Sequence, residues 1–492
     1  MPGNSPPQER YAQARIAHWD GVARKLGRWQ GLGGYYHRRL ARIYQFAVPP
    51  GQKVLELGCA TGDLLAALRP STGVGVDFSP EMIARAKARH PELVFVQADA
   101  HGLESIEGPF DFIILSDLVN DLWDVQSVLN QAARLSGPGT RIILNSYSRV
   151  WELPLNLAAR LKLAQPKLVQ NWLSVEDIAN LLQLSGFEPM RHWEEVLWPV
   201  CTPLWDALCN RFLVKLWPFR MLALTNFLIA RPSPQTQAPL PAARSPGGDG
   251  PGGGPVVSVI VPARNEAGNI QAIFERTPEM GGGTQLVFVE GGSSDKTCEA
   301  IEKAMRENPR RRCKLFKQTG AGKGDAVRKG FAEASGEVLM ILDADLTVPP
   351  EDLPRFYEAL RSGKGEFING VRLVYPMESQ AMRFLNLVAN KLFSLAFSWL
   401  LGQSVKDTLC GTKVLWKTAY ERIAANRAYF GDFDPFGDFD LIFGAARLNL
   451  KIVDLPIRYR ERTYGSTNIQ RWKHGWLLLR MVAFAARRIR FI

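Results

Sequence analysis

The sequence predicts an α/β protein of two domains, each built on a mainly parallel sheet. Between residues 53 and 147 short apolar runs alternate with helical patterns, and the alternation begins again at residue 256. This alternation is typical of doubly wound parallel sheets. Residues 231–255 contain seven Pro, six Gly and no aromatic residue, and cannot bury enough apolar surface to fold. We therefore expect domains over residues 1–230 and 256–492, joined by a flexible linker.

Composition and charge narrow the classes of protein to which this chain can belong. It has 492 residues, 46% of them hydrophobic and 22% charged, which describes a globular protein with two or three cores. The formal net charge is +12, and residues 458–492 hold nine Lys or Arg but one acid, Glu461. An anionic membrane, an acidic substrate or nucleic acid would each suit this charge. The chain has no recognisable nucleic-acid-binding motif, so we expect no nucleic-acid partner.

The cysteines and the apolar runs of the sequence indicate where in the cell the protein is located. The six cysteines include no CxxC pair, so reduced thiols in the cytoplasm are the simplest account. The N-terminal stretch MPGNSPPQER is polar and does not predict a signal peptide. The longest uncharged apolar window beside a predicted helix is residues 392–405, shorter than the roughly 20 residues that a spanning helix needs. We expect a cytoplasmic protein that associates peripherally with the cytoplasmic face of a membrane.

The elements of the first domain follow in order. Residues 1–50 predict a polar lead-in and then amphipathic helices in HWDGVARKLGRW and YYHRRLARIYQF. Strand patterns follow in KVLEL, GVGVD, LVFVQ, FDFIIL and TRIILNSYS. After the first strand comes a glycine loop, residues 56–62, of the kind that lets the backbone approach a ligand closely. Asp77 ends the second strand, 21 residues after Glu56, where a carboxylate can bind a pair of ribose hydroxyls.

With these motifs the first domain resembles the class I S-adenosylmethionine-dependent methyltransferases, which have a Rossmann-like sheet. Their pattern is an acid and Gly-x-Gly-x-Gly after the first strand, with further acids after the second and third. Ala60 stands here where the middle glycine is usual. A dinucleotide-binding domain is a weaker alternative because the full GxGxxG is missing, and a domain that binds nothing stays open. The resemblance implies S-adenosyl-L-methionine as cofactor, with Asp77 at the ribose, Asp99 near the adenine, and Glu56, Gly58 and Gly62 at the methionine end.

The residues for methyl transfer itself are harder to identify. Asn120, Asp121 and Trp123 follow the fourth strand, where such enzymes contact the acceptor. Asp121 or His37 could act as the general base, although a lone His on a helix is more often structural. The end of the domain, residues 197–230, is rich in Trp and Leu. It could cap the acceptor pocket or touch lipid, but we expect it to pack into the core.

The central feature of the second domain is VLMILDADLTVPP, residues 338–350. Its apolar run predicts a buried parallel strand that ends in Asp343 and Asp345. Open α/β sheets bind ligands at the carboxyl ends of strands. Two carboxylates at such a strand end can hold a divalent cation, which in turn binds a diphosphate. The alternative role of Asp345 is to cap a helix that begins near Pro349.

Other strand ends supply polar residues to the same edge. VVSVIVPARNEAGNI ends a strand at Asn265 and Glu266, and TQLVFVEGGSSDKTCEAI ends one at Glu290. QTGAGKGDAVRKGFAEA is a glycine-rich, cationic entry to a helix, with Lys323 and Arg328 available to anions. Each piece alone has an explanation as a cap or a turn. The ordered set predicts a site for a nucleotide diphosphate.

From these motifs the second domain resembles the family 2 glycosyltransferases of the GT-A fold, and among them the dolichol-phosphate mannose synthase-like group. The resemblance covers nearly all of residues 256–470, including INGVRLVYP, KDTLCGTKVL and LPIRYRERTYGSTNI. Glu290-Gly291 replaces the usual Asp-Asp, which leaves the donor nucleotide open, and Thr347 stands where Gln or Ser is common. The resemblance implies that Pro262, Arg264 and Glu266 line the nucleotide, that Glu290 lies near the base, and that Asp343 and Asp345 hold Mn²⁺ or Mg²⁺ and the donor diphosphate.

The acceptor decides which residues catalysis needs. The reaction is a displacement at the anomeric carbon, in which cations neutralise the departing nucleoside diphosphate. A phosphate monoester is already anionic, and Arg372, Arg462 and Ser466 match the family's ligands for it. A hydroxyl acceptor would need a carboxylate base, for which Asp438 and Asp440 are candidates. We favour the phosphate, with a structural salt bridge as the alternative role of Arg462.

Two segments suit contact with a lipid acceptor. AMRFLNLVANKLFSLAFSWLLG predicts an interfacial helix, and the C-terminal WKHGWLLLRMVAFAARRIRFI mixes Trp and Leu with four Arg. An amphipathic end of this kind favours a membrane surface as partner. A buried terminal helix or a dimer face is the alternative.

Together the two halves predict a bifunctional, membrane-associated enzyme. The second domain would transfer a sugar from a GDP- or UDP-hexose to polyprenyl phosphate, with a divalent cation. The first would methylate a substrate that the sequence does not identify. The alternative is a glycosyltransferase that acts on a glycan or soluble hydroxyl, with the first half as a non-catalytic cofactor-binding or tethering module.

Overall fold

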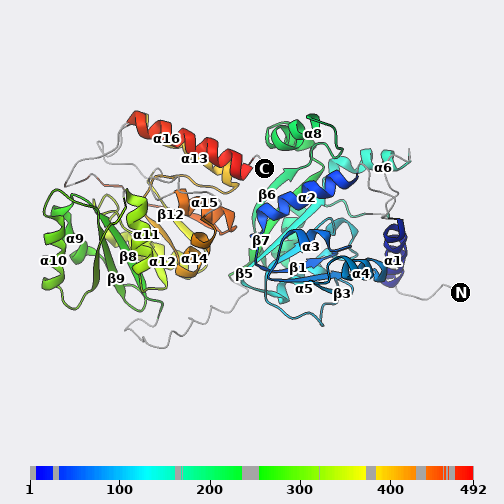
Figure 1. Ribbon diagram of the computed structural model, residues 1–492, viewed down its shortest axis with the longest axis horizontal. Coiled ribbons are helices and arrows are strands. Elements are labelled where there is room, and N and C mark those ends of the chain that lie inside the picture. The colour runs from blue at the N-terminus through cyan, green and yellow to red at the C-terminus, as the bar shows by residue number, and fades with distance from the viewer. Residues whose placement is uncertain are drawn as a thin grey trace. The chain divides into compact units, whose positions relative to one another are not determined.

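The computed structural model describes residues 7–25, 33–160, 168, 170–234, 254–320, 322–372, 384–427, 439–457, 459, 460, 462, 464 and 471–490. The chain divides into two compact units, which meet in sequence at residues 238 and 239. Each unit is built on a seven-stranded sheet with helices packed around it (Figure 1). The predicted α/β class with two sheets is confirmed.

The sheet of the first unit has the strand order β3-β2-β1-β4-β5-β7-β6. Strands β1 to β5 run parallel, and β7 lies antiparallel between β5 and β6. The strand order reverses between β1 and β4, the point at which doubly wound sheets bind their ligands. The strands are β1 (Lys53–Leu57), β2 (Thr72–Asp77), β3 (Val94–Gln97), β4 (Phe110–Leu115), β5 (Ser136–Tyr147), β6 (Phe187–Glu195) and β7 (Thr225–Pro232).

Local signals in the sequence explain where the helices of this unit begin. Ser79 caps α4 by accepting a hydrogen bond from the Met82 N–H, and Pro80 suits the first helical position. Ser174 and Asp177 form a capping box at the start of α7. The helices are α1 (Pro7–Lys25), α2 (Gly33–Ala47), α3 (Asp63–Ala67), α4 (Pro80–Arg89), α5 (Val125–Arg134), α6 (Glu152–Arg160), α7 (Val175–Leu184) and α8 (Trp205–Ala207).

The structure corrects two expectations for the end of this unit. Strand β7 continues to Pro232 and Arg231 forms a 2.8 Å ion pair with Glu188, so the first two residues assigned to the linker belong to the sheet. Most of the linker lies outside the described residues. The Trp-rich end, residues 197–230, packs into the core only in part. Phe227 and Ile229 of β7 are core residues, but the exposed fractions of the tryptophans are 38% at Trp198, 50% at Trp205 and 74% at Trp217.

The sheet of the second unit has the strand order β10-β9-β8-β11-β13-β12-β14. It is mixed, because β13 runs antiparallel to both β11 and β12 while the other neighbours are parallel. The strands are β8 (Val257–Ala263), β9 (Thr284–Glu290), β10 (Arg312–Lys317), β11 (Val338–Ile341), β12 (Phe367–Val371), β13 (Lys413–Trp416) and β14 (Ile452–Pro456). All four residues of β11 are buried, as the apolar run predicts.

The helices of the second unit cover this sheet, and α11 lies directly against β8 and β9 (Figure 1). Its close approach depends on Gly330, since a Cβ there would lie 2.5 Å from Ile260 Cγ2. The helices are α9 (Ile270–Arg276), α10 (Thr297–Glu307), α11 (Lys323–Glu333), α12 (Leu353–Arg361), α13 (Phe384–Leu401), α14 (Lys417–Ala425), α15 (Phe439–Arg447) and α16 (Arg471–Ala485).

This packing gives a stability prediction. Gly330→Ala should destabilise the second unit by about 1–3 kcal/mol, because the added methyl overfills the α11–β8 interface. Gly21→Ala in α1, where a Cβ meets nothing within 4 Å, should instead be neutral or stabilising by up to about 1 kcal/mol. Scanning calorimetry of the full chain measures both. Equal transition temperatures for Gly330→Ala and the parent would contradict the tight interface.

Candidate functional site

The glycine loop after β1 has the backbone shape that a close ligand needs. Gly58, Ala60 and Gly62 have positive φ values of 72°, 46° and 74°. A Cβ at Gly62 would lie 2.5 Å from the ring of Phe95, so this position has no room for a side chain. Ala60, which departs from the family pattern, accepts the left-handed conformation, and its N–H points at the carboxylate of Asp77, 2.9 Å away.

Asp77 stands at the end of β2, facing this loop. Its other oxygen accepts a hydrogen bond from the Ser79 N–H, also at 2.9 Å. Burial raises the pKa of Asp77, and these two hydrogen bonds oppose the rise. The carboxylate is therefore held in one orientation at the carboxyl edge of the sheet.

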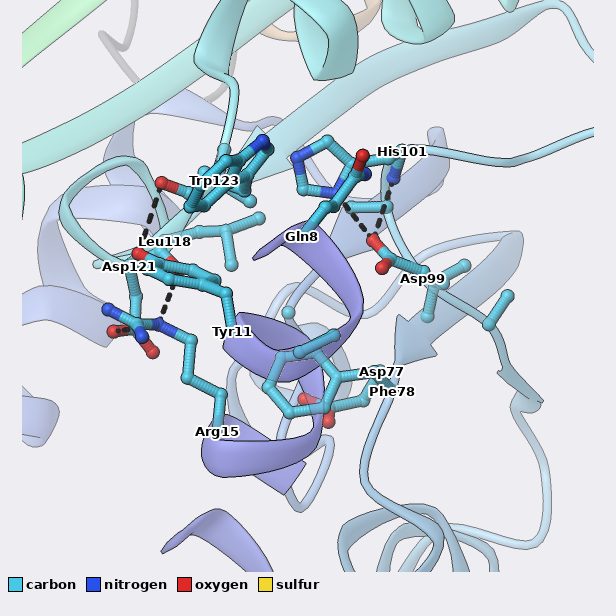
Figure 2. Close-up of a pocket in the computed structure, with 16 residues that line it drawn as sticks. Gln8, Tyr11, Arg15, Asp77, Phe78, Asp99, His101, Leu118, Asp121 and Trp123 are labelled. Atoms are coloured by element: carbon cyan, nitrogen blue, oxygen red, sulfur yellow. Dashed lines mark hydrogen bonds and ion pairs between the residues drawn. The ribbon is translucent and has the colours of Figure 1, made fainter. Parts of the chain in front are cut away.

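A pocket opens at this edge, and three of the five predicted cofactor residues line it. Gly58, Asp77 and Asp99 face it together with residues of α1 (Figure 2). Glu56 and Gly62 are not in the lining. Glu56 is buried at the end of β1, burial holds its pKa well above the usual value, and its Oε2 has no hydrogen-bond partner. An acceptor atom left unpaired in this way fits the expectation of a donor group from a ligand.

The opposite wall of the pocket comes from α1, of which the sequence analysis predicted only the part from His18 as a helix and treated the part before it as a polar lead-in. Tyr11, Arg15 and Trp19 lie four residues apart on one face of this helix. The Arg15 Nε and Asp121 Oδ1 atoms are 3.0 Å apart (Figure 2). The Trp19 indole donates to Asp121 Oδ2 at 2.9 Å. Asp121, a candidate general base, thus anchors α1 over the pocket. The i, i+4, i+8 spacing was the signal that could have revealed this face.

Two other predicted acceptor-side residues, His37 and Asn120, do not line the pocket. His37 is exposed and does not line the pocket. Asn120 is buried, donating to the Asn171 carbonyl and accepting from the Tyr147 N–H. By contrast His101, which the sequence analysis missed, lines the pocket and places Nδ1 2.6 Å from Asp99 Oδ1. This hydrogen bond is the main cause of the lowered pKa of Asp99.

In the second unit the DxD acids lie beyond the end of β11, and each forms an ion pair with a basic side chain. Lys323 Nζ is 2.6 Å from Asp343, and Arg462 donates to Asp345 at 2.6 Å. Burial would raise the pKa of Asp343, but Lys323 outweighs it and the pKa is lowered. The Thr347 hydroxyl also donates to Asp345, at 2.7 Å. The structure therefore brings four predicted site residues together at this edge.

Arg462 also links the DxD acids to Glu266, whose carboxylate lies 3.6 Å away. Burial raises the pKa of Glu266, and Arg462 opposes the rise. Asn269 donates to the same carboxylate at 2.7 Å. One guanidinium thus bridges Glu266 and Asp345, which come from loops that follow different strands.

The predicted nucleotide side is formed by the neighbouring ends of β8 and β9. Pro262 pairs with Val289 in the sheet, and Glu290 is the last residue of β9. The Glu290 carboxylate accepts the Ser293 N–H at 2.5 Å, which helps to lower its pKa against the effect of burial. Arg264 is exposed just beyond β8. These residues share one edge, although the carboxylate of Glu290 is turned onto its own loop.

Two other predicted catalytic residues, Arg372 and Asp440, form ion pairs with residues outside the DxD motif. Arg372 forms a bidentate pair with the buried Asp407, at 2.7 and 2.9 Å, and this pairing raises its pKa against the effect of burial. Asp440, at the start of α15, pairs with Arg427 at 2.8 Å. Ser466 and Asp438 lie outside the described residues. Sequence reasoning missed Asp407, which orients Arg372.

A divalent cation was expected at Asp343 and Asp345. Among the residues that the structure describes, no group of three or more His, Cys, Asp or Glu could form a complete protein cage for a metal. Two carboxylates with substrate phosphates nevertheless suit Mg²⁺ or Mn²⁺. Gly411 lies so close that a Cβ there would overlap the Asp343 carboxylate and the Lys323 ammonium. The donor set fits a cation that a diphosphate completes.

Comparison with known proteins agrees with this division of the chain. The family model described as glycosyl transferase family 2 matches residues 258–424, and one described as methyltransferase domain matches residues 32–192. The chain is 29% identical over 218 residues to a dolichol-phosphate mannosyltransferase of Pyrococcus furiosus, covering 44% of this chain and 59% of the relative.

A second curated relative and a solved structure are also similar to part of the chain. An undecaprenyl-phosphate 4-deoxy-4-formamido-L-arabinose transferase of Edwardsiella ictaluri is 25% identical over 215 residues, 43% of this chain and 62% of the relative. The chain thus spans about three fifths of the length of these two relatives. A solved glucosyl-3-phosphoglycerate synthase of Mycobacterium tuberculosis with UDP is 20% identical, with a TM-score of 0.35, over 48% of this chain and 80% of that one. The chain joins an N-terminal methyltransferase domain to a C-terminal family 2 glycosyltransferase domain.

Proposed function

We propose that the second domain transfers a hexosyl group from a nucleotide-sugar, GDP- or UDP-linked, to a polyprenyl phosphate. The observation that carries this proposal is the meeting of Asp343, Asp345, Lys323 and Arg462 at one sheet edge. Carboxylates there suit a cation and a diphosphate, and the basic groups suit anions. The names of the two relatives, which specify dolichol phosphate and undecaprenyl phosphate, favour a polyprenyl phosphate acceptor.

In this proposal each charged group has a separate task. Asp343 and Asp345 would hold Mg²⁺ or Mn²⁺, which neutralises charge on the departing nucleoside diphosphate when bound. Lys323, at the N-terminus of α11, adds positive charge beside the same leaving group. An oxygen of the acceptor phosphate attacks the anomeric carbon as the bond to the diphosphate breaks. Arg462 would orient that phosphate, and no general base is required because the attacking oxygen is already anionic.

We also propose that this reaction takes place at a membrane surface, through α13 and α16, which pack against each other (Figure 1). Leu395 on α13 is 68% exposed and Trp476 on α16 is 67% exposed, and Arg480 and Arg487 are exposed near the C-terminus. Apolar and aromatic side chains beside arginines suit an anionic lipid interface. Within the described ranges, no helix is long and apolar enough to cross a bilayer.

For the first domain we propose methyl transfer from S-adenosyl-L-methionine. The glycine loop, Asp77 and Asp99 surround one pocket at the switch point of the sheet, which supports a nucleoside ligand there. The ligand supplies an activated methyl group when bound. Asp77 would receive the ribose hydroxyls, and α1, anchored through Asp121, would exclude water from the site.

The first prediction concerns the DxD acids. Asp345→Asn should lower sugar transfer at least about 100-fold, because half of the carboxylate charge that would bind the cation is lost. Asp352→Asn, at the start of α12, should keep parental activity. The assay measures labelled sugar entering the organic phase from a panel of nucleotide-sugars with polyprenyl phosphate and Mn²⁺, and EDTA should abolish transfer. Full activity of Asp345→Asn would rule out the metal role.

The second prediction separates phosphate from hydroxyl acceptors. Arg462→Ala should raise the KM for polyprenyl phosphate about 10- to 100-fold, as expected for the loss of one charge-assisted hydrogen bond. Asp440→Asn should have little effect on kcat, because a phosphate needs no base. The reverse pattern, in which Asp440→Asn is inactive and Arg462→Ala is normal, would favour a glycan or soluble hydroxyl acceptor.

The third prediction tests cofactor binding. Asp77→Ala should weaken binding of S-adenosyl-L-methionine about 10- to 100-fold, since it removes an acceptor for ribose hydroxyls. Glu92→Gln, at an exposed glutamate, is the matched control. Titration calorimetry of the full chain gives both dissociation constants. If the parental chain binds no S-adenosyl-L-methionine, the first domain is a tethering module and methyl transfer is excluded.

A further inference from the structure

The first unit carries a large apolar surface that its sheet does not cover. It is formed by residues 149–157 and residues 198–222, which we call the apolar edge. Its most exposed large apolar side chains are Leu204 (87%), Leu153 (79%) and Trp217 (74%). Soluble proteins seldom expose so many large apolar side chains together, and such a surface usually marks a binding face.

The two segments of the apolar edge are joined and leave the sheet at the same place. The Trp151 indole donates to the Leu222 carbonyl at 2.8 Å, so the segments lie side by side. Residues 149–157 directly follow β5, and residues 198–222 connect β6 to β7. Thr225, the first residue of β7, pairs with Tyr147 at the carboxyl end of β5. The apolar edge therefore extends from the carboxyl ends of the parallel strands.

Polar contacts hold the longer segment in place and leave its apolar side chains outward. Asn210 is buried and accepts the Trp198 N–H at 2.8 Å, and it donates to the Tyr35 hydroxyl at 2.9 Å. Lys215 is also buried and forms an ion pair with Glu195, the last residue of β6. Because buried polar groups tie this segment to α2 and β6, its exposed leucines and tryptophans are a feature of the fixed structure.

Charge on the apolar edge favours one occupant, an anionic lipid surface. Arg149, Arg211 and Arg220 are exposed within the two segments, whereas Glu152 and Asp206 are only partly exposed. Tryptophan and leucine beside arginine is the composition of membrane-interface surfaces, where apolar groups enter the headgroup region and arginines meet lipid phosphates.

The apolar edge and the pocket lie at the same edge of the sheet. The pocket lies at the carboxyl ends of β1, β2 and β4, and these strands are parallel to β5, so the apolar edge belongs to the same edge of the sheet. Trp123, which lines the pocket, is itself 46% exposed. A molecule held in a bilayer beneath the apolar edge would therefore face the side of the sheet where methyl transfer is proposed.

We infer that the apolar edge docks the methyltransferase domain on an anionic lipid surface, and that its methyl acceptor is a lipid-borne molecule. This inference rests on the proposed methyl transfer. In that step an oxygen or nitrogen of the acceptor forms a bond to the methyl carbon. The S–CH₃ bond breaks with its electron pair left on sulfur, which gives S-adenosylhomocysteine, and the acceptor's proton leaves to solvent.

A native cysteine provides the probe for docking. Cys201 lies within the apolar edge and is exposed, whereas Cys298 and Cys313 are half-buried and the other three cysteines are buried. The full chain is labelled at Cys201 with an environment-sensitive maleimide dye and mixed with phosphatidylcholine vesicles, with and without phosphatidylglycerol. We expect a blue shift of the dye, larger with phosphatidylglycerol, and quenching by spin-labelled lipid. Cys201→Ser measures labelling at other sites.

Variants assign the response to the apolar edge. Leu204→Ser combined with Trp217→Ser should weaken the vesicle affinity that the dye reports about tenfold or more, because two exposed apolar side chains no longer enter the lipid. Leu184→Ser, at the end of α7 and 60% exposed in the parent, should leave it unchanged. Circular dichroism confirms folding of each variant.

The outcomes separate this inference from the function on which it rests. A dye that does not respond to vesicles, in a chain that binds S-adenosyl-L-methionine in calorimetry, overturns lipid docking and leaves methyl transfer standing. A blue shift that depends on protein concentration without vesicles also overturns it, because another protein surface then covers the edge. A vesicle response in a chain that does not bind the cofactor overturns the methyl acceptor and keeps the docking surface.

Discussion

Both domains depend on one constraint, the burial of parallel strands. A buried strand must pair its backbone groups with its neighbours, so chemically active residues gather where the pairing ends. In the first sheet the glycine loop follows β1 and faces Asp77, the last residue of β2. In the second sheet Asp343 and Asp345 lie just beyond the end of β11. The glycine loops, the acidic side chains and the basic side chains that pair with them therefore lie at the same edge of each sheet.

The glycosyltransferase site shows how the fold holds acids at short range. Asp343 has Lys323, Asp345 has Arg462, and the buried Asp407 has Arg372. Buried charge is costly without a partner, so each carboxylate is stabilised by a basic group. The partners differ in exposure. The pairs of the DxD acids are partly exposed, as the proposed binding of a cation and phosphates requires, while Arg372 and Asp407 are a buried, bidentate pair suited to a positioning role.

The methyltransferase domain depends on contacts between distant parts of the chain. Helix α1 lines the pocket and is held by Asp121, more than a hundred residues away, so a residue proposed as a general base also anchors this helix. The apolar edge also depends on contacts between residues that are distant in the sequence. Asn210 and Lys215 fix its polar side to the domain, so that Leu204 and Trp217 stay exposed. A pocket covered by α1, with the apolar edge on the same side of the sheet, is consistent with the proposed lipid-borne acceptor.

The sequence by itself determined the two α/β domains, the glycine loop with Asp77, and the DxD acids after a buried strand, because these signals are local: strand periodicity, turn residues and short spacing. Only the tertiary structure decided that Asp121 binds Arg15, that Arg462 bridges Glu266 and Asp345, and that the Trp-rich segment faces outward. Each depends on which segments distant in sequence become neighbours. A run of Trp and Leu has the same pattern in a core and at a lipid-facing surface, and only packing distinguishes them.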